Sequence, residues 1–148
     1  MGIKLSFADL THTGRTIDAN FFPLGCGLIA AYALENLDRN IDIQIFKYPK
    51  DFAAYLDETL PQIACFSNYQ WNIRLNYEYA KRIKERAPET ITIFGGPNYP
   101  VDLGEQKYFL RKHPDIDFYI EGEGELAFAE LFKALANHDF DLQKFHSE

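Results

Sequence analysis

Polar and aromatic side chains are concentrated in residues 67–72, whose sequence is SNYQWN. The segment offers a serine hydroxyl, three amides and two aromatic rings. Such a set suits a heteroaromatic ring or a polar tail of a ligand, which needs flat apolar contacts and a few placed hydrogen bonds. A purely structural role is the alternative, in which Ser67 or Asn68 caps a helix and Trp71 packs at the rim of a sheet. Capping and binding are compatible.

Two glycine-containing turns offer bare backbone to a ligand. Residues 95–98 read GGPN, and residues 121–125 read EGEGE. Because glycine lacks a Cβ, it accepts a positive φ and lets a ligand approach the backbone amides. Either turn also has a structural interpretation: the first as a tight turn, the second as a helix start favoured by Glu123 and Glu125 through the helix dipole.

The remaining chemistry-bearing residues match no catalytic or metal-binding pattern. His12 stands alone in a long polar loop, where a histidine is more often solvated than bound to metal. Cys26 and Cys65 are isolated in apolar surroundings, outside any CxxC or CxxxCxxC spacing, and are expected to be buried thiols of a cytoplasmic protein. GxxxxGK[ST] is absent, GxGxxG does not follow the first strand, and no nucleophile triad is found.

The elements that must position these loops alternate between strand and helix patterns. Strands are expected over 3–10, 41–45, 62–67, 90–94 and 116–120, and helices over 23–37, 52–60, 73–87, 102–113 and 125–136. Five βα repeats predict an α/β fold, a flavodoxin-like or Rossmann-like three-layer sandwich with a five-stranded parallel sheet. Ligands in such sheets bind at the carboxyl ends of the strands, so the site is expected in the loops 9–22, 67–72, 95–101 and 121–125.

Composition narrows the class of protein. The chain has 148 residues, 47% hydrophobic and 25% charged, which fits one globular domain. Its net charge of −7 argues against a nucleic-acid partner. No run approaches the roughly 18 to 20 apolar residues that span a bilayer, and residues 1–10 lack a signal-peptide pattern, so no membrane association and a cytoplasmic location are expected.

Four ordered blocks carry a family resemblance. They are PLGCGLIAAYALE at 23–35, IACFSNYQWN at 63–72, FGGPNYP at 94–100 and DFYIEGEGELAFAELFKAL at 117–135. Over nearly its whole length the chain closely resembles the N-terminal cobalamin-binding domain of radical S-adenosylmethionine (SAM) enzymes. The resemblance implies a corrinoid over the strand ends, with its nucleotide tail running down into the sheet.

The resemblance also implies roles for particular residues. Ser67 and Asn68 would hydrogen-bond the tail, residues 95–97 would shape the wall along it, residues 121–123 would border its base, and Tyr69 and Trp71 would lie near the macrocycle. The complete set of candidate cofactor-binding residues is Thr11, His12, Ser67, Asn68, Tyr69, Trp71, Asn72, Gly95, Gly96, Pro97, Asn98, Glu121, Gly122 and Glu123.

Two departures from related patterns concern histidines. Corrinoid domains of the methionine-synthase type supply a cobalt ligand from D-x-H-x-x-G, whereas residues 9–14 read DLTHTG, with the histidine displaced by one residue. The radical enzymes commonly lack that histidine, so His12 is only a candidate lower ligand to cobalt. Asn98 stands where the family commonly has histidine.

The expected function follows from what the chain holds and lacks. Without CxxxCxxC it cannot hold a [4Fe–4S] cluster. We therefore expect residues 1–138 to be a cobalamin-binding domain and 139–148 to begin a linker to an absent C-terminal domain. The module would bind a corrinoid and present it to a radical SAM domain, in cis or in trans, that holds SAM and the cluster. Methyl transfer or a radical rearrangement would result.

Three alternatives remain open at the level of sequence. A flavodoxin-like flavin or electron-transfer domain would place Tyr69 and Trp71 beside an isoalloxazine ring, although the first loop lacks a phosphate cradle. A receiver-type interaction domain would use Asp9 as phosphoacceptor, but Asp9 has no second acidic neighbour. The corrinoid fold could also persist without a corrinoid, because fold does not establish function.

Overall fold

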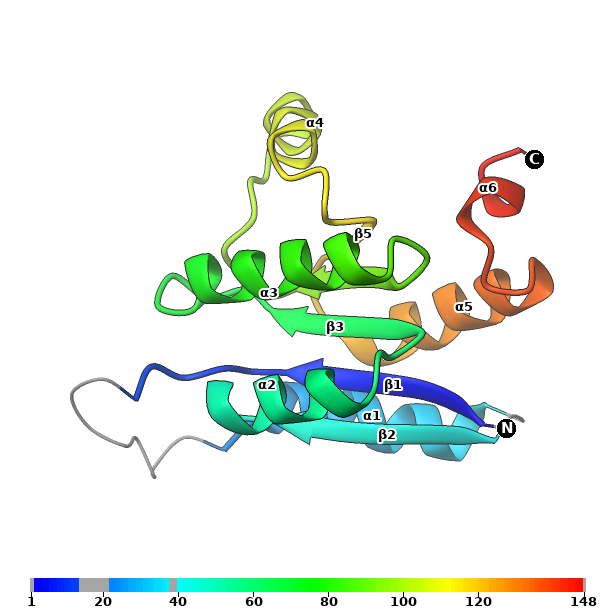
Figure 1. The fold of residues 1–148 in the computed structure, drawn as a ribbon. Coiled ribbons are helices and arrows are strands. Elements are labelled where there is room, and N and C mark those ends of the chain that lie inside the picture. The colour runs from blue at the N-terminus through cyan, green and yellow to red at the C-terminus, as the bar shows by residue number, and fades with distance from the viewer. Residues whose placement is uncertain (1, 14–21, 38–39, 148) are drawn as a thin grey trace.

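The computed structural model describes residues 2–13, 22–37 and 40–147 and contains one five-stranded sheet flanked by helices (Figure 1). The elements are β1 (Ile3–Ala8), α1 (Leu24–Asn36), β2 (Ile41–Phe46), α2 (Pro49–Glu58), β3 (Ile63–Ser67), α3 (Ile73–Arg86), β4 (Ile91–Gly95), α4 (Leu103–Lys112), β5 (Phe118–Ile120), α5 (Gly124–Asn137) and α6 (Leu142–Phe145). Each predicted strand and helix is present, with ends displaced by a few residues. Helix α2, for example, begins at Pro49, a residue that suits the first helical turn.

All strand pairs are parallel, and the order is β2-β1-β3-β4-β5. This confirms the predicted flavodoxin-like α/β fold. The chain moves from β1 outward to β2 and then returns to β3 on the other side of β1. Strand order therefore reverses beside β1 and β3, which is where open α/β sheets bind ligands.

Hydrophobic pattern decides which strands are central. Every residue of β3 is buried, as its continuous apolar sequence predicts. Strand β2 lies at the edge, where the half-buried Ile41 and Ile43 alternate with the exposed Asp42 and Gln44. The alternation in the sequence thus predicted the edge correctly.

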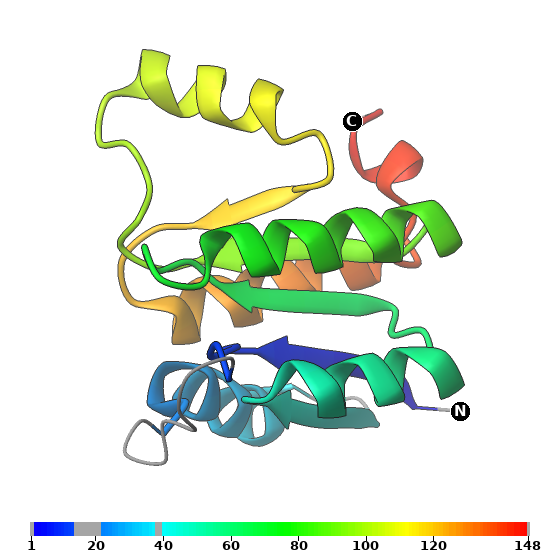
Figure 2. The same ribbon diagram turned by 60° about the vertical axis from the view of Figure 1, so that its left-hand side comes forward.

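Helices cover both faces of the sheet (Figure 2). Helices α1 and α5 pack on one face, where Phe128 and Phe132 lie in a core with β1, β3 and β4 residues. Helices α2 and α3 cover the other face, where Phe52 from α2 packs beside Phe66 and Phe94. Consecutive strand residues therefore feed two separate cores, as the period of two in a strand requires.

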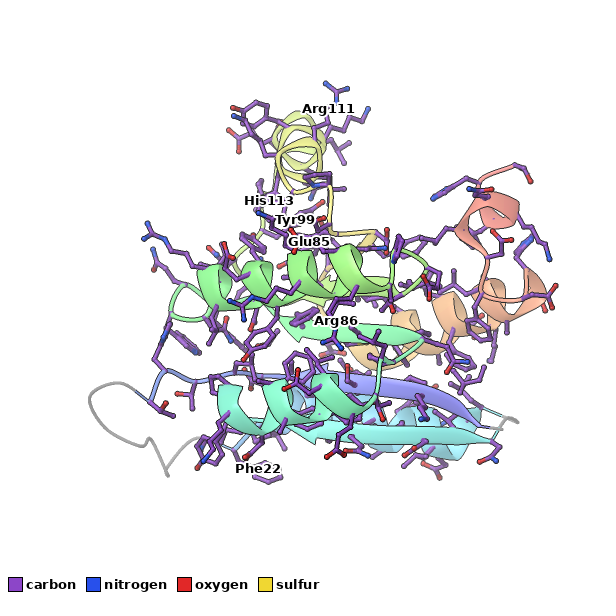
Figure 3. The ribbon with its side chains drawn as sticks, viewed as in Figure 1. Phe22, Glu85, Arg86, Tyr99, Arg111 and His113 are labelled. Carbon is purple, nitrogen blue, oxygen red and sulfur yellow. The ribbon has the colours of Figure 1, made fainter. Side chains whose placement is uncertain are left out.

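Helix α4 stands away from the sheet beyond α3 in both ribbon views and has no buried residue (Figures 1 and 2). Asp102 starts it by accepting hydrogen bonds from the amides of Gly104 and Glu105. Tyr99, in the segment before α4, and His113, which follows its last residue, lie between α4 and α3 (Figure 3). Phe109 contacts both, with ring centroids 5.1 Å from Tyr99 and 4.7 Å from His113. Aromatic contacts thus hold α4 in place.

The C-terminal residues fold back onto the domain. The Phe140 ring lies 5.1 Å from the Phe132 ring of α5, and the Phe145 ring of α6 lies 5.5 Å from the Phe118 ring of β5. A linker is predicted from residue 139 onward, and in this stretch Phe140, Leu142 and Phe145 pack against the preceding core. The domain boundary at residue 138 stays a prediction. Across the described ranges, no helix is long and apolar enough to cross a bilayer.

Candidate functional site

Two adjoining cavities open at the carboxyl ends of the strands. The first cavity, of about 220 Å³, lies where β1, β3, β4 and β5 end beside the first turns of α1 and α5. The second cavity, of about 480 Å³, lies over the ends of β1 and β2. Asp9, Gly25 and Tyr69 line both, so the two cavities share a wall. They lie at the reversal of strand order, where the sequence placed the site.

The walls of the first cavity are apolar at depth and glycine-rich near the helix starts. Phe7, Ile93 and Phe128 contribute apolar side chains. Gly25 and Gly122 also line it, and a Cβ added at either would meet no atom within 4 Å. Both positions therefore border open space, and Gly122, with φ +68°, also has a backbone conformation that favours glycine.

Gly96 has a different role. Its φ is +125°, and an added Cβ would lie 2.9 Å from the Asn68 carbonyl oxygen. Only glycine fits this position without strain, because the turn after β4 presses against the turn after β3. The predicted glycine turn is thus required by packing between two loops, and it also lines the first cavity.

A hydrogen-bonded network occupies the shared wall. Ser67 Oγ donates to Asp9 Oδ1 at 2.6 Å, and Asn72 Nδ2 donates to Ser67 Oγ at 2.8 Å. Asn72 Oδ1 accepts from the Tyr69 backbone N–H at 2.9 Å. Asn72 is fully buried and lines neither cavity. It therefore orients Ser67 and Tyr69 from behind the wall.

Asn68 connects the turns after β3 and β4 with strand β5. Its side chain is fully buried and donates to the Asn98 carbonyl at 2.8 Å and to the Tyr119 hydroxyl at 3.0 Å. The Tyr119 hydroxyl in turn donates to the Gly96 carbonyl at 2.8 Å. Burial raises the pKa of Tyr119 to about 12, so the hydroxyl keeps its proton for that bond. Asn68 thus fixes the rim of the first cavity without lining it.

Aromatic rings mark the rim between the cavities. The rings of Tyr69 and Trp71 stack in parallel, with centroids 4.4 Å apart. Trp71 is 56% exposed and lines the second cavity. His12 and the half-buried Lys47 lie in that cavity as well. A flat ligand above the second cavity would meet this aromatic pair on one side.

The two thiols line the first cavity and are neutral. Burial and then the nearby Asp9 carboxylate raise the pKa of Cys26 to about 12. Burial, followed by Cys26, raises the pKa of Cys65 well above its usual value. The prediction of free, buried thiols is confirmed. Among the residues that the structure describes, no group of three His, Cys, Asp or Glu side chains could hold a metal ion.

The predicted site residues fall into three groups. The first cavity is lined by Ser67, Tyr69, Gly95, Gly96, Gly122 and Glu123, and the second by Thr11, His12, Tyr69 and Trp71. Asn68, Asn72, Pro97, Asn98 and Glu121 line neither. Glu121 instead accepts a hydrogen bond from Gln106 of α4.

Sequence reasoning missed Gly25 as a site residue, and it considered Asp9, in the predicted loop 9–22, only as a phosphoacceptor. Both line both cavities. Asp9 follows β1 and pairs with a serine 58 positions away, so only the adjacency of β1 and β3 could have connected them. Gly25 was hidden inside an apolar helix pattern.

Comparison with known proteins shows the family to which the chain belongs. A family model for the B12 binding domain matches residues 11–132. The chain belongs to the B12-binding domain family. The resemblance to the cobalamin-binding domains of radical SAM enzymes is thereby confirmed, since the curated relatives include such enzymes.

Two curated relatives match most of the B12-binding domain. A cobalamin-dependent radical SAM methyltransferase, TokK of Streptomyces tokunonensis, is 34% identical over 143 residues, which cover 88% of this chain and 20% of TokK. The 2-(S-pantetheinyl)-carbapenam-3-carboxylate methyltransferase of Streptantibioticus cattleyicolor is 33% identical, covering 80% of this chain and 18% of that enzyme. The chain therefore spans about a fifth of the length of these relatives.

A solved structure with the same fold is a signal receiver domain of an HD domain-containing protein from Pseudomonas fluorescens Pf-5. It aligns over the full length of both chains with a TM-score of 0.56 and 12% sequence identity. At that identity the likeness concerns the fold alone. B12-binding and receiver domains thus share the flavodoxin-like arrangement of strands and helices.

Proposed function

We propose that this B12-binding domain holds cobalamin at the carboxyl edge of its sheet, with the macrocycle over the second cavity and the nucleotide tail in the first. The observation that carries the proposal is the pair Gly25 and Gly122. Each lines the first cavity where an added Cβ would meet no neighbouring atom. An apolar, glycine-lined slot at the switch point of the sheet fits a heteroaromatic base on a flexible tail.

Each group of residues has a distinct task in this proposal. Phe7, Ile93 and Phe128 contact the base through apolar surface, and Ser67 meets its polar edge. Tyr69 and Trp71 flank the macrocycle. His12 lies in the second cavity and is the candidate lower ligand to cobalt. Asn68 and Asn72 act indirectly, by fixing the turns that carry these residues.

The bound corrinoid would supply a cobalt centre able to carry a methyl group or take part in radical chemistry, while the protein supplies binding and orientation. The domain would present that cobalt to a radical SAM domain in cis or in trans, for methyl transfer or a radical rearrangement. Supporting this, TokK is named a cobalamin-dependent radical SAM methyltransferase, and this chain matches a fifth of it. The SAM and [4Fe–4S] cofactors would belong to the partner domain. A cytoplasmic location completes the proposal and agrees with two free thiols.

A titration of the purified chain with hydroxocobalamin tests this function. Trp71 is the only tryptophan and stacks at the rim of the second cavity, so its fluorescence should be quenched in parallel with a saturable change in the visible spectrum. Flavin mononucleotide provides the comparison ligand. Binding of the flavin and not of hydroxocobalamin would contradict the proposal and favour an electron-transfer domain.

A further inference from the structure

The direction of the hydrogen bond between Asn72 and the Ser67 hydroxyl is fixed by a backbone amide. The Tyr69 N–H can only donate, and it reaches Asn72 Oδ1 at 2.9 Å. The oxygen of the Asn72 amide therefore faces Tyr69, and its nitrogen faces Ser67. Since an amide nitrogen can only donate, the 2.8 Å contact between Asn72 Nδ2 and Ser67 Oγ uses an acceptor position of the hydroxyl.

The single proton of the Ser67 hydroxyl is committed to Asp9. Ser67 Oγ lies 2.6 Å from Asp9 Oδ1, and an ionised carboxylate can only accept. A hydroxyl has one donor and two acceptor positions, of which Asn72 uses one acceptor and Asp9 uses the donor. What remains for a ligand in the first cavity is one acceptor lone pair.

Toward a ligand, the charged groups that line the first cavity, like Ser67, can only accept hydrogen bonds. Of the described residues that line it, the ones with charged side chains are Asp9, Glu123 and Glu125, all carboxylates. Cys26 and Cys65, whose thiols burial keeps protonated, add no charge. The side-chain environment therefore favours a ligand group that donates a hydrogen bond or carries positive charge.

We propose that Asp9 is a specificity-determining residue, which makes Ser67 an acceptor and so selects a hydrogen-bond donor on the nucleotide tail of the corrinoid. The inference rests on the proposed function, because that tail is the group that would reach Ser67. The base of the cobalamin tail is a benzimidazole. When its ring nitrogen does not bind cobalt, that nitrogen presents a lone pair and accepts hydrogen bonds. To bind at Ser67 it must either arrive protonated by solvent or draw the Ser67 proton away from Asp9.

Asp9→Asn removes this restriction with little change of shape. Asp9 Oδ1 also accepts from Asn72 Nδ2 at 3.4 Å, so the oxygen of the new amide should keep this position. A neutral amide oxygen holds the Ser67 proton less strongly than a carboxylate does, so the proton becomes available to the ring nitrogen. Ser67→Ala removes the hydroxyl, and the double variant completes a cycle. Asp42→Asn, at an exposed position on β2, is the matched control for loss of one negative charge.

The test measures dissociation constants from Trp71 fluorescence for hydroxocobalamin and for dicyanocobinamide, which has a corrin ring but no nucleotide base. Asp9→Asn should bind hydroxocobalamin about 3-fold to 10-fold more tightly than the wild type, the value of one neutral hydrogen bond. Asp9→Asn should bring no gain in affinity when Ser67 is also replaced by alanine, or when the ligand is dicyanocobinamide. Asp42→Asn should bind hydroxocobalamin like the wild type.

Two results would overturn the inference while leaving the proposed function intact. One is hydroxocobalamin binding by Asp9→Asn that is unchanged, or that is weaker while dicyanocobinamide binding stays the same. The other is an equal gain for dicyanocobinamide or in the absence of the Ser67 hydroxyl. A wild type that binds neither corrinoid would instead reject the proposed function and this inference together. Structural damage from Asp9→Asn is distinguishable, because it would weaken both corrinoids alike.

Discussion

The carboxyl edge of the sheet is hollow beside α1 and α5 but filled with rings beside α3 and α4. On the hollow side, Gly25 and Gly122 leave space next to an apolar wall. On the filled side, the Tyr99 and Tyr119 rings stack with centroids 3.7 Å apart, and the Phe109 ring meets Tyr119 edge-on at 6.0 Å. One sheet edge thus provides both a binding slot and a rigid support, and small residues on one side make the difference.

The two sides meet through backbone and hydrogen bonds. Tyr119, on the filled side, donates to the carbonyl of Gly96, which lines the first cavity. The buried Asn68 side chain donates a hydrogen bond to the same Tyr119 hydroxyl. The filled side therefore holds the rim of the first cavity in position. Substitutions on the two sides should change the free energy of unfolding by different amounts.

The largest expected effect comes from enlarging the hollow side. Phe128 is 1% exposed, lines the first cavity and packs 5.4 Å from the Phe7 ring. Phe128→Ala should lower the free energy of unfolding by about 3 to 5 kcal/mol, through lost burial and an added void. Phe109→Ala on the half-buried filled side should cost less, about 1 to 2 kcal/mol. Urea unfolding measures both, and equal losses would contradict the comparison.

A smaller effect is expected where the sides connect. Tyr119→Phe keeps the ring stack but leaves the Gly96 carbonyl without its donor, so unfolding free energy should fall by about 1 to 2 kcal/mol. Tyr108→Phe on α4 is the matched control, because Tyr108 is 61% exposed and its loss should change stability by less than about 0.5 kcal/mol. Indistinguishable urea midpoints for the two variants would show that the hydrogen bond from Tyr119 to Gly96 does not contribute to stability.

The smallest effect concerns pH on the filled side. Burial lowers the pKa of His113, whose ring lies 4.1 Å from Tyr77, below the usual 6.5. The unfolded chain therefore binds more protons than the folded chain just below pH 6.5, and stability falls as pH drops through that window. His113→Asn should unfold with a shallower dependence of urea midpoint on pH. A steeper dependence in the variant would contradict the assignment.

Periodicity and turn residues predicted the fold well. The apolar run of β3 and the alternation of β2 identified a central and an edge strand before the topology was known. The parallel order alone predicted a candidate site at the carboxyl edge, and two cavities open there. These features depend on local sequence, which is why they could be predicted.

Which individual side chains line the candidate site was harder to predict from the sequence. Asn68 and Asn72 look like ligands in a polar loop, yet both are fully buried and form hydrogen bonds with other groups of the protein. Asp9 and Gly25 gain their importance from contacts between elements distant in sequence. Side-chain direction in turns, and space left between helices, arise only once the elements pack.

The central claim is that the hollow beside α1 and α5 receives the corrinoid tail. Gly25→Leu tests it most directly, since a helical glycine replaced by leucine favours the helix while its side chain enters open space that borders both cavities. Gly27→Leu, in the same helix but lining neither cavity, is the matched control. We expect Gly25→Leu to remain folded by thermal denaturation and to lose saturable hydroxocobalamin binding, with Gly27→Leu binding like the wild type. Wild-type affinity in a folded Gly25→Leu protein would contradict the account.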